Sequence, residues 1–444
     1  MTRVLGLAAG LVTVLGAVPV GAAEKAPTFH RDVVRILQDE CQDCHRPGEV
    51  APFSLLTYEQ ARKRASDIAA VVEARKMPPW PASTTEGGPF RDARVLSSDE
   101  IATLTTWAEA GCPEGDPKDG PSPRTWNSEW ALDKPDLELT MPEPYSLGAE
   151  GRDEFRVFVI PTGLTEGKWV SAIDLKPGNT KVVHHVLAAF DTAGRARTLD
   201  KADPDPGYKV FGGFGIFPTG GIGGWAPGKR PQALPDGVGR YLPAGSDLLL
   251  QIHYHKSGKP ETDASRIGLY FAGRPVDKQV RGNAVTPPRA GVFVKPKLLI
   301  PAGDSSYEVT GTSTIEQDSH VTAVAPHMHW LGKDFLLTAT RPDGSKVTLI
   351  RIDDWNFNWQ GTYDFVAPLP LPKGTRIDMR AHFDNTAQNP ANPSSPPKDV
   401  KWGEQTTDEM CIGFMQLTFD DEHRGNRPPP RFQVAPAKDA AGSH

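Results

Sequence analysis

The sequence has little cysteine and no excess of positive charge. Four cysteines in 444 residues are too few for a scaffold held together by disulfides. The 49 Lys and Arg residues are outnumbered by 55 Asp and Glu, which gives a formal net charge of −6 and argues against nucleic acid as a partner. With 38% hydrophobic and 23% charged residues, the chain is neither disordered nor a protein of many membrane spans.

Long apolar runs are also absent, apart from one at the N-terminus. After Arg3 the sequence is apolar from Val4 to about Val20, and small residues then lead to Ala23. This order is typical of a cleaved signal peptide, residues 1–23, with an uncleaved anchor as the alternative. We therefore expect a periplasmic or secreted protein without a stable membrane span.

Residues 24–112 have the pattern of a small all-helical domain. Two capping boxes, beginning at Thr57 and Ser97, are typical of helix starts. Gly111 follows the second of these helices at the position where helices often end in the left-handed conformation. The next residues, 113–126, are rich in Pro, Gly and Asp and predict a linker.

From residue 127 the pattern changes to short strands separated by turns, which predicts antiparallel sheets. We expect two jelly-roll-like β-sandwich domains and a flexible tail, at residues 127–290, 291–424 and 425–444. A repeat supports two related domains, because PAGS at 243–246 leads to His253 and PKGT at 372–375 leads to His382 after the same interval. Chance similarity at a common strand entry is the alternative.

Cys41-Gln-Asp-Cys44-His45 is a C-x-x-C-H motif, the attachment sequence of c-type haem. Its two thiols can bond to the haem vinyl groups, and the adjacent imidazole can bind the iron. A redox-active cysteine pair and half of a zinc site are the alternatives, but neither explains the adjacent histidine. Met77, in a Lys-Met-Pro-Pro-Trp loop, is the expected second axial ligand, with a core methionine as the alternative. The helical domain is thus predicted to be a cytochrome c domain with one covalent haem c.

Histidines gather in the β half of the chain in three groups. The groups are His184-His185, His253 with His255, and His327 with His329, while His382 stands apart. Residues at i and i+2 of a strand share a face, so the second and third groups can each present two imidazoles to one metal. The adjacent pair needs a bulge for joint ligation. Ordinary surface histidines are the alternative for any one pair, but three pairs together favour copper or zinc.

Four short motifs then resemble a known family. In order they are His184-His185-Val-Leu, Gln251-x-His253-Tyr254, His327-x-His329-x-Leu331-Gly332-Lys333 and Glu409-Met410-Cys411. This order resembles copper type II, ascorbate-dependent monooxygenases, the family of peptidylglycine α-hydroxylating and dopamine β-monooxygenases, over roughly residues 150–420. The resemblance implies two consecutive antiparallel β-sandwiches with a cleft between two coppers.

The resemblance also implies which residues bind the two copper ions. One copper is expected on His184, His185 and His253, and the oxygen-activating copper on His327, His329 and Met410. A methionine ligand favours Cu(I), the state that must meet O₂. His255 and His382 match no ligand of the family, and either could instead support a ligand from behind.

The chain departs from the family in its cysteines and its substrate contacts. Its β half keeps only Cys411, whose usual partner corresponds to Ala381, so Cys411 is expected to be free or paired with Cys112. Two residues that bind the substrate carboxylate in the peptidylglycine enzyme correspond to Ala325 and Ile412. No carboxylate anchor is therefore expected there, which argues against a glycine-extended peptide as substrate.

These observations favour an exported copper-dependent monooxygenase with its own haem. It would hydroxylate an activated C–H bond of a small organic molecule, R–H + O₂ + 2e⁻ + 2H⁺ → R–OH + H₂O. Electrons from an ascorbate-like donor or another cytochrome would pass through the haem. The alternative is a non-enzymatic periplasmic electron-transfer or copper-binding protein on the same fold, but the complete set of expected ligands favours the enzyme. A haem-dependent catalyst is a weaker third hypothesis, because Met77 would close the iron to substrate.

Overall fold

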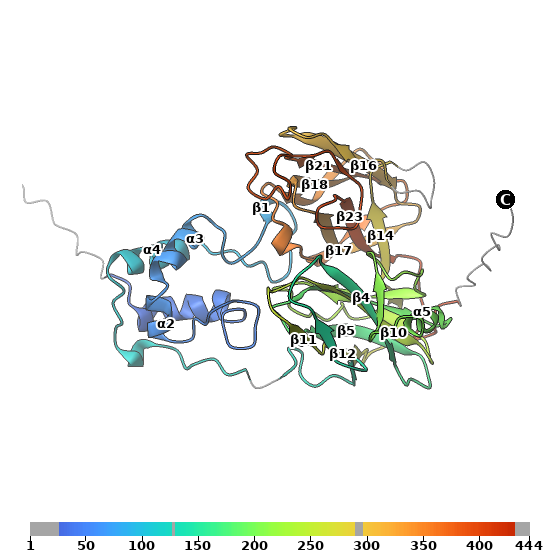
Figure 1. Ribbon diagram of the computed structural model, residues 1–444, viewed down its shortest axis with the longest axis horizontal. Helices are drawn as coiled ribbons and strands as arrows, with labels where there is room; N and C mark the ends of the chain where they lie inside the picture. Colours follow the sequence, from blue (N-terminus) through green and yellow to red (C-terminus); the bar gives the residue numbers. More distant parts are fainter. Residues whose placement is uncertain (1–25, 127–128, 289–295, 431–444) are drawn as a thin grey trace, which may run out of the picture.

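The computed structural model describes residues 26–126, 129–288 and 296–430, which form a helical segment and two β-sandwiches (Figure 1). The expected signal peptide, residues 1–23, and most of the expected tail, residues 431–444, lie outside the described residues. No helix within the described ranges is long and apolar enough to cross a membrane.

The helical segment packs its helices around one small apolar core. Its elements are η1 (Phe29–Val33), α1 (Val34–Ile36), η2 (Leu37–Cys41), α2 (Tyr58–Arg62), α3 (Ala65–Glu73), α4 (Ser98–Glu109) and η3 (Pro117–Asp119). Both predicted capping boxes are present, with the Thr57 and Ser97 side chains accepting backbone N–H bonds at the starts of α2 and α4. Gly111 has a φ of +80°, as predicted for the end of α4. Leu104 and Trp107 of α4 are fully buried in the core.

The segment is not all-helical, because one strand leaves it and joins the second sandwich. Strand β1 (Ala82–Gly87) pairs antiparallel with β19 (Lys346–Ile352). Trp80 and Phe90, on either side of β1, contact the Tyr363 ring at centroid distances of 5.1 and 5.3 Å. Aromatic contacts of this kind bury much apolar area, so they hold the helical segment against the second sandwich. Figure 1 shows β1 beside that sandwich.

The expected linker, residues 113–126, follows the surface of the helical segment and is not a free tether. Gln38 donates a hydrogen bond to the Ser122 carbonyl at 3.0 Å, and Arg124 donates to the Gln38 carbonyl at 2.6 Å. The Pro113 carbonyl also accepts a backbone bond from the start of η1. The linker is therefore packed against the helical segment at these residues.

The first sandwich consists of two five-stranded sheets that share one core. In spatial order, one sheet contains β7 (Tyr208–Val210), β4 (Glu154–Pro161), β10 (Asp247–Tyr254), β6 (Val183–Asp191) and β8 (Gly220–Trp225). The other contains β13 (Lys278–Gln279), β9 (Val238–Leu242), β5 (Lys168–Lys176), β12 (Arg266–Phe271) and β2 (Leu137–Thr140). Short elements beside them are β3 (Tyr145–Leu147), β11 (Glu261–Asp263) and α5 (Arg195–Asp200). The strands pair antiparallel except for β13 with β9, which pair parallel.

The second sandwich has a five-stranded and a four-stranded sheet around its own core. The first sheet contains β1, β19, β18 (Gly332–Thr340), β21 (Arg376–Phe383) and β16 (Tyr307–Thr314). The second contains β14 (Arg281–Val285), β23 (Cys411–Phe419), β17 (Ser319–Met328) and β20 (Tyr363–Leu371), with β15 (Leu299–Ile300), β22 (Val400–Lys401) and η4 (Phe357–Trp359) nearby. Strand β14 pairs with β23, so the second sandwich begins before the expected boundary at residues 290–291.

The two copies of the sequence repeat have the same local structure. Each copy is a turn that leads directly into a strand, β10 in the first sandwich and β21 in the second. The hydroxyl of Ser246 donates to a proline carbonyl at 2.5 Å, and Thr375 makes the corresponding bond at 2.6 Å. Gly245 and Gly374 both have positive φ, +66° and +87°, which favours glycine at this turn. The two turns are therefore similar in structure as well as in sequence.

Candidate metal centre

Strands β6 and β10 bring three histidines of the first sandwich together. His185 pairs directly with His253, but the next pairing is Tyr254 with Val183, so His184 is an extra residue in β6. Such an irregularity turns a side chain away from the simple alternation of a strand. The bulge that the adjacent pair was predicted to need is therefore present, and all three imidazoles reach one place.

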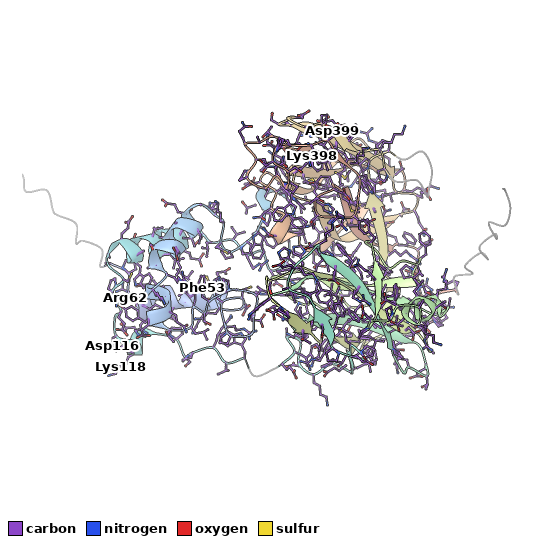
Figure 2. The ribbon with its side chains drawn as sticks, in the orientation of Figure 1. Phe53, Arg62, Asp116, Lys118, Lys398 and Asp399 are labelled. Atoms are coloured by element: carbon purple, nitrogen blue, oxygen red, sulfur yellow. The ribbon has the colours of Figure 1, made fainter. Side chains whose placement is uncertain are left out.

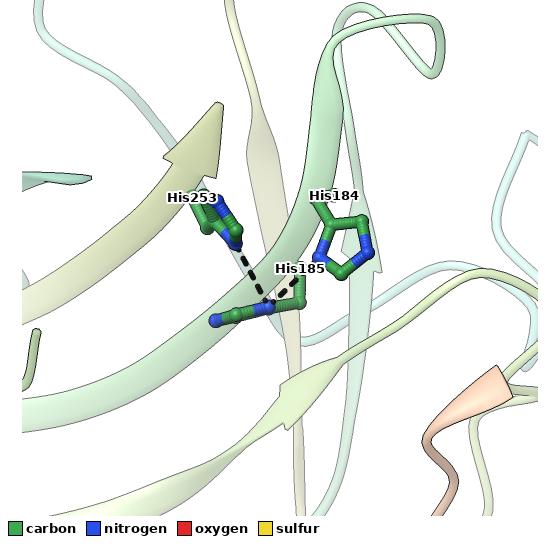
Figure 3. A group of neighbouring side chains, drawn as sticks. All are labelled: His184, His185 and His253. Atoms are coloured by element: carbon green, nitrogen blue, oxygen red, sulfur yellow. Dashed lines mark hydrogen bonds between the residues drawn. The ribbon is translucent and has the colours of Figure 1, made fainter. Parts of the chain in front are cut away.

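The three imidazole rings converge through their Nδ1 atoms (Figure 3). The Nδ1 atom of His185 lies 3.2 Å from that of His184 and 3.4 Å from that of His253. One nitrogen from each ring lies within 4.8 Å of the others, a group that could hold a metal ion. Neutral imidazoles that turn lone pairs toward one point suit a cation with a preference for nitrogen, such as copper or zinc.

Asp153 supports this group from behind. The Nε2–H of His253 donates to Asp153 at 2.9 Å, which leaves the Nδ1 lone pair directed at the other two histidines. His255 also donates to Asp153, at 3.1 Å, but its side chain is 67% exposed and stands outside the group. Burial would raise the pKa of Asp153, but the two histidine hydrogen bonds hold this pKa below its ordinary value. His255 thus contacts Asp153, which is the hydrogen-bond partner of the candidate ligand His253. This contact agrees with the expectation that His255 could support a ligand.

The second sandwich presents His327 at the end of β17 and His329 just beyond it, with ring centroids 5.2 Å apart. His327 donates through Nδ1–H to the Gln360 side-chain oxygen at 2.6 Å, and His329 donates through Nδ1–H to the Asp408 carbonyl at 3.0 Å. Because both partners are acceptors, each Nδ1 carries the proton and each Nε2 keeps its lone pair. Both rings are therefore prepared to bind a metal through Nε2.

Glu409 connects His329 to Met410. Its carboxylate is completely buried and accepts backbone N–H bonds from His329 at 2.8 Å, Leu331 at 2.6 Å and Met410 at 3.2 Å. Burial raises the pKa of Glu409 to about 8, against the three N–H bonds that favour the ionised form. The His329 loop and the start of β23 are thus held to one side chain, next to the buried Met410.

A single phenylalanine ring lies between the two histidine groups. Phe357 of η4 stacks on His184 at a centroid distance of 5.1 Å and 15°. The same ring meets His329 edge-on at 5.9 Å and 84°. The two groups are therefore adjacent across the boundary between the sandwiches, and one aromatic ring contacts both.

Burial keeps these histidines neutral. Burial, together with the neighbouring histidines, lowers the pKa of His184 and of His327 to about 3 and that of His329 to about 4. The pKa of His185 is lowered well below its ordinary value for the same reason. Near pH 7 all four rings offer lone pairs without first releasing a proton, which is the state that binds metals.

The residues of the haem motif lie at the end of η2 in the helical segment. The backbone N–H groups of Cys44 and His45 both bond to the Cys41 carbonyl, so the three residues form one turn. His45 donates through Nδ1–H to the Phe53 carbonyl at 3.1 Å, which leaves Nε2 free for an iron. Figure 2 labels Phe53 on the side of this segment nearest the sandwiches. Both thiols are free, and this donor set fits a c-type haem.

The remaining predicted residues have clear positions. Met77 is half-buried in the loop that leads to β1. His382 lies on β21 and pairs with Asp334 at 2.8 Å and Glu308 at 3.5 Å, so it supports neither histidine group. Cys112 and Cys411 are both buried and both free, so of the two alternatives for Cys411 the structure has the free thiol and not the pair with Cys112. Sequence reasoning missed Asp153, Gln360 and Phe357 altogether, because nothing in the local pattern connects them to the histidines.

Comparison with known proteins supports one family for the second sandwich. Residues 289–421 match the family model described as copper type II ascorbate-dependent monooxygenase, C-terminal domain, which supports a copper-dependent oxidoreductase in general. No curated protein sequence matches the chain.

Similarity to solved structures is low. The T13 particle of infectious bursal disease virus has a TM-score of 0.18 and 10% identity, over 67% of this chain and 71% of that one. A structure of PNGF-II has a TM-score of 0.27 and 9% identity, over 65% of this chain and 66% of that one. At these TM-scores neither likeness bears on function.

Proposed function

We propose that the protein is an exported copper-dependent monooxygenase that hydroxylates an activated C–H bond and carries its own c-type haem. The observation that carries the proposal is the meeting of two histidine groups from two sandwiches, each with lone pairs free at neutral pH. The family match of residues 289–421 supports the same chemistry from the sequence side. Export is inferred from residues 1–23 alone.

In this proposal the first copper is held by the Nδ1 atoms of His184, His185 and His253. The second is held by the Nε2 atoms of His327 and His329 with the thioether of Met410. Bound copper would supply one-electron chemistry and O₂ activation.

The protein's part is to keep these donors neutral and fixed in place. Asp153 fixes the His253 tautomer, and Gln360 fixes that of His327. Glu409 holds the His329 loop and the Met410 backbone in register. Positioning partners of this kind commonly change metal affinity by ten- to a hundredfold.

The haem is proposed to be bonded to Cys41 and Cys44, with His45 and Met77 as axial ligands. The bond from His45 to the Phe53 carbonyl supports the first of these axial roles. A haem held by these residues would pass electrons and would leave no position on the iron for substrate. It would pass electrons from an ascorbate-like donor or another cytochrome to the copper sites.

Two contacts support an electron relay from the helical segment to the second sandwich. Trp80, three residues after Met77, contacts the Tyr363 ring at 5.1 Å. Gln360, three residues before Tyr363, accepts the hydrogen bond from His327. The helical segment also meets the first sandwich directly, because Asp43 and Arg230 form an ion pair at 2.5 Å.

Oxygen uptake with ascorbate tests the enzyme proposal. We expect copper-loaded protein to consume O₂ in a substrate-dependent way, and His329→Ala to reduce this rate at least a hundredfold. His382→Ala is the matched control, because His382 contacts neither histidine group, and it should keep the full rate. Copper-loaded protein that consumes no O₂ with any C–H substrate would favour the non-enzymatic carrier instead.

Stopped-flow absorbance tests the relay separately. When the fully reduced protein meets O₂ and substrate, haem oxidation should follow product formation. Trp80→Leu should slow haem oxidation, while turnover driven directly by ascorbate continues. A haem that stays reduced during turnover would contradict the relay and leave the monooxygenase proposal intact.

A further inference from the structure

A cleft lies between the two sandwiches, and none of the candidate ligand histidines lines it. The space in it that is open to the centre of a water molecule is about 70 Å³, and the cleft opens to solvent. The first sandwich contributes Lys229 and Arg240 to its wall, and the second contributes Asp364 and Gln416. Polar side chains that converge on one cleft at a junction of two domains are typical of a site for a small molecule.

Lys229 and Arg240, two of the four cationic side chains that line this cleft, have neutral partners. Lys229 donates to the Gly224 carbonyl at 2.9 Å, and Arg240 donates to the side-chain oxygen of Gln416 at 2.6 Å. Within the described ranges, neither side chain has a carboxylate within ion-pair distance. An ammonium group has three donors and a guanidinium has five, so most of their hydrogen-bonding capacity is left for another partner.

The carboxylates that line the cleft do not balance these charges. Asp174 already accepts the Ala131 N–H at 2.7 Å and lies 3.7 Å from Lys176. Asp364 is the carboxylate whose charge acts on both Lys229 and Arg240, and burial raises the pKa of Asp364. Burial lowers the pKa of Lys229, and it lowers the pKa of Arg240 to about 10, as expected for cations with too little compensation.

We propose that this cleft binds a small organic anion, whose carboxylate is received by Lys229 and Arg240. A charge-assisted pair with Arg and Lys would offset the cost of removing two cations from water. Ile173, Trp225 and Pro368 also line the cleft, so its walls suit an apolar body attached to the anionic head. An inorganic anion would leave these walls unused.

Gln416 of this cleft lies on β23, the strand on which Ile412 pairs with His327. Gln416 and Ile412 are four residues apart, about 13 Å at roughly 3.3 Å per residue. The proposed anion site is therefore separate from the second histidine group, and binding to it does not depend on copper.

Equilibrium dialysis of the full-length protein with benzoate tests the proposal, with benzamide as the matched neutral probe. We expect saturable binding of one benzoate per chain and at least tenfold weaker binding of benzamide. Arg240→Gln and Lys229→Gln should each weaken benzoate at least tenfold. Arg274→Gln is the control, because Arg274 forms an exposed surface pair with Asp236, and it should bind benzoate as the wild type does.

Thermal unfolding of the wild type supplies a readout that needs no variant to fold. Benzoate should raise the midpoint, whereas sodium chloride of equal ionic strength should not. Equal binding of benzoate and benzamide, or the absence of any saturable benzoate binding, would overturn the proposal whether or not copper is bound. If ascorbate displaces benzoate, the natural anion is a reductant; if it does not, the natural anion is a carboxylate substrate.

Discussion

At a pH above about 8, where Glu409 is ionised, replacing it by glutamine removes one hydrogen-bond acceptor at the point where the second histidine group is assembled. One carboxylate oxygen accepts from His329 and Met410, and the other accepts from Leu331. In the amide, one of these oxygens becomes an NH₂ group that cannot accept. At least one buried backbone N–H therefore loses its partner, at a cost of about 1–3 kcal/mol.

The effect should be greatest at the second copper site. We expect Glu409→Gln to lower the urea midpoint of the second sandwich and to lose one of two coppers during dialysis against a weak chelator. Loss of a positioning partner of this kind should weaken the copper affinity of the site by ten- to a hundredfold. Trp355, which donates to the His329 carbonyl at 3.0 Å, provides a fluorescent reporter next to the site.

Glu308→Gln is the control, because Glu308 is an exposed residue whose weak contact is to His382 at 3.5 Å. Surface changes of this type usually stay within about 0.5 kcal/mol. If Glu409→Gln keeps both coppers and unfolds at the same urea concentration as Glu308→Gln, the role given to Glu409 is wrong.

Four further outcomes follow from the structure. Between pH 7 and pH 5, His329 alone should lower the free energy of unfolding of the metal-free protein by about 2 kcal/mol. The pKa of His329 is about 4 in the folded protein and higher in the unfolded chain, so over this range the unfolded chain binds the extra proton. Urea titrations at both pH values measure the difference. Met410→His should keep copper but lose most O₂ uptake, because imidazole withdraws the soft ligand that favours Cu(I). Met77→Ala should abolish the weak long-wavelength haem absorption of a sulfur ligand, and its persistence would point to another ligand. A protease site placed within residues 113–126 should be cut without releasing the helical segment, since β1 remains paired with β19; separate elution of the two fragments would contradict this.

Local sequence signals predicted local structure well. The capping boxes at Thr57 and Ser97 and the glycine at 111 depend on neighbours within a few residues, and all are present. Alternation along strands likewise predicted antiparallel sheets, because a half-buried strand must turn every second side chain toward its core.

Features that depend on distant partners were not predictable in this way. The sequence Ala-Ser-Thr-Thr-Glu-Gly of β1 has no apolar alternation, and its pairing with β19 depends on a segment more than 260 positions away. His382 occupies the repeat position of His253, yet Asp334 on the neighbouring strand pairs with it instead of a metal group. Phe357 comes from a loop, so nothing in its own sequence indicates that its ring meets two histidine groups.

The central claim is that two separate histidine groups each bind one copper beside a covalent haem. Metal analysis of the purified chain, its His185→Ala variant and its His329→Ala variant tests this most directly. The account predicts two coppers and one iron per chain in the wild type, and one copper and one iron in each variant. Loss of both coppers from either variant, or a wild type that binds one copper in all, would contradict it.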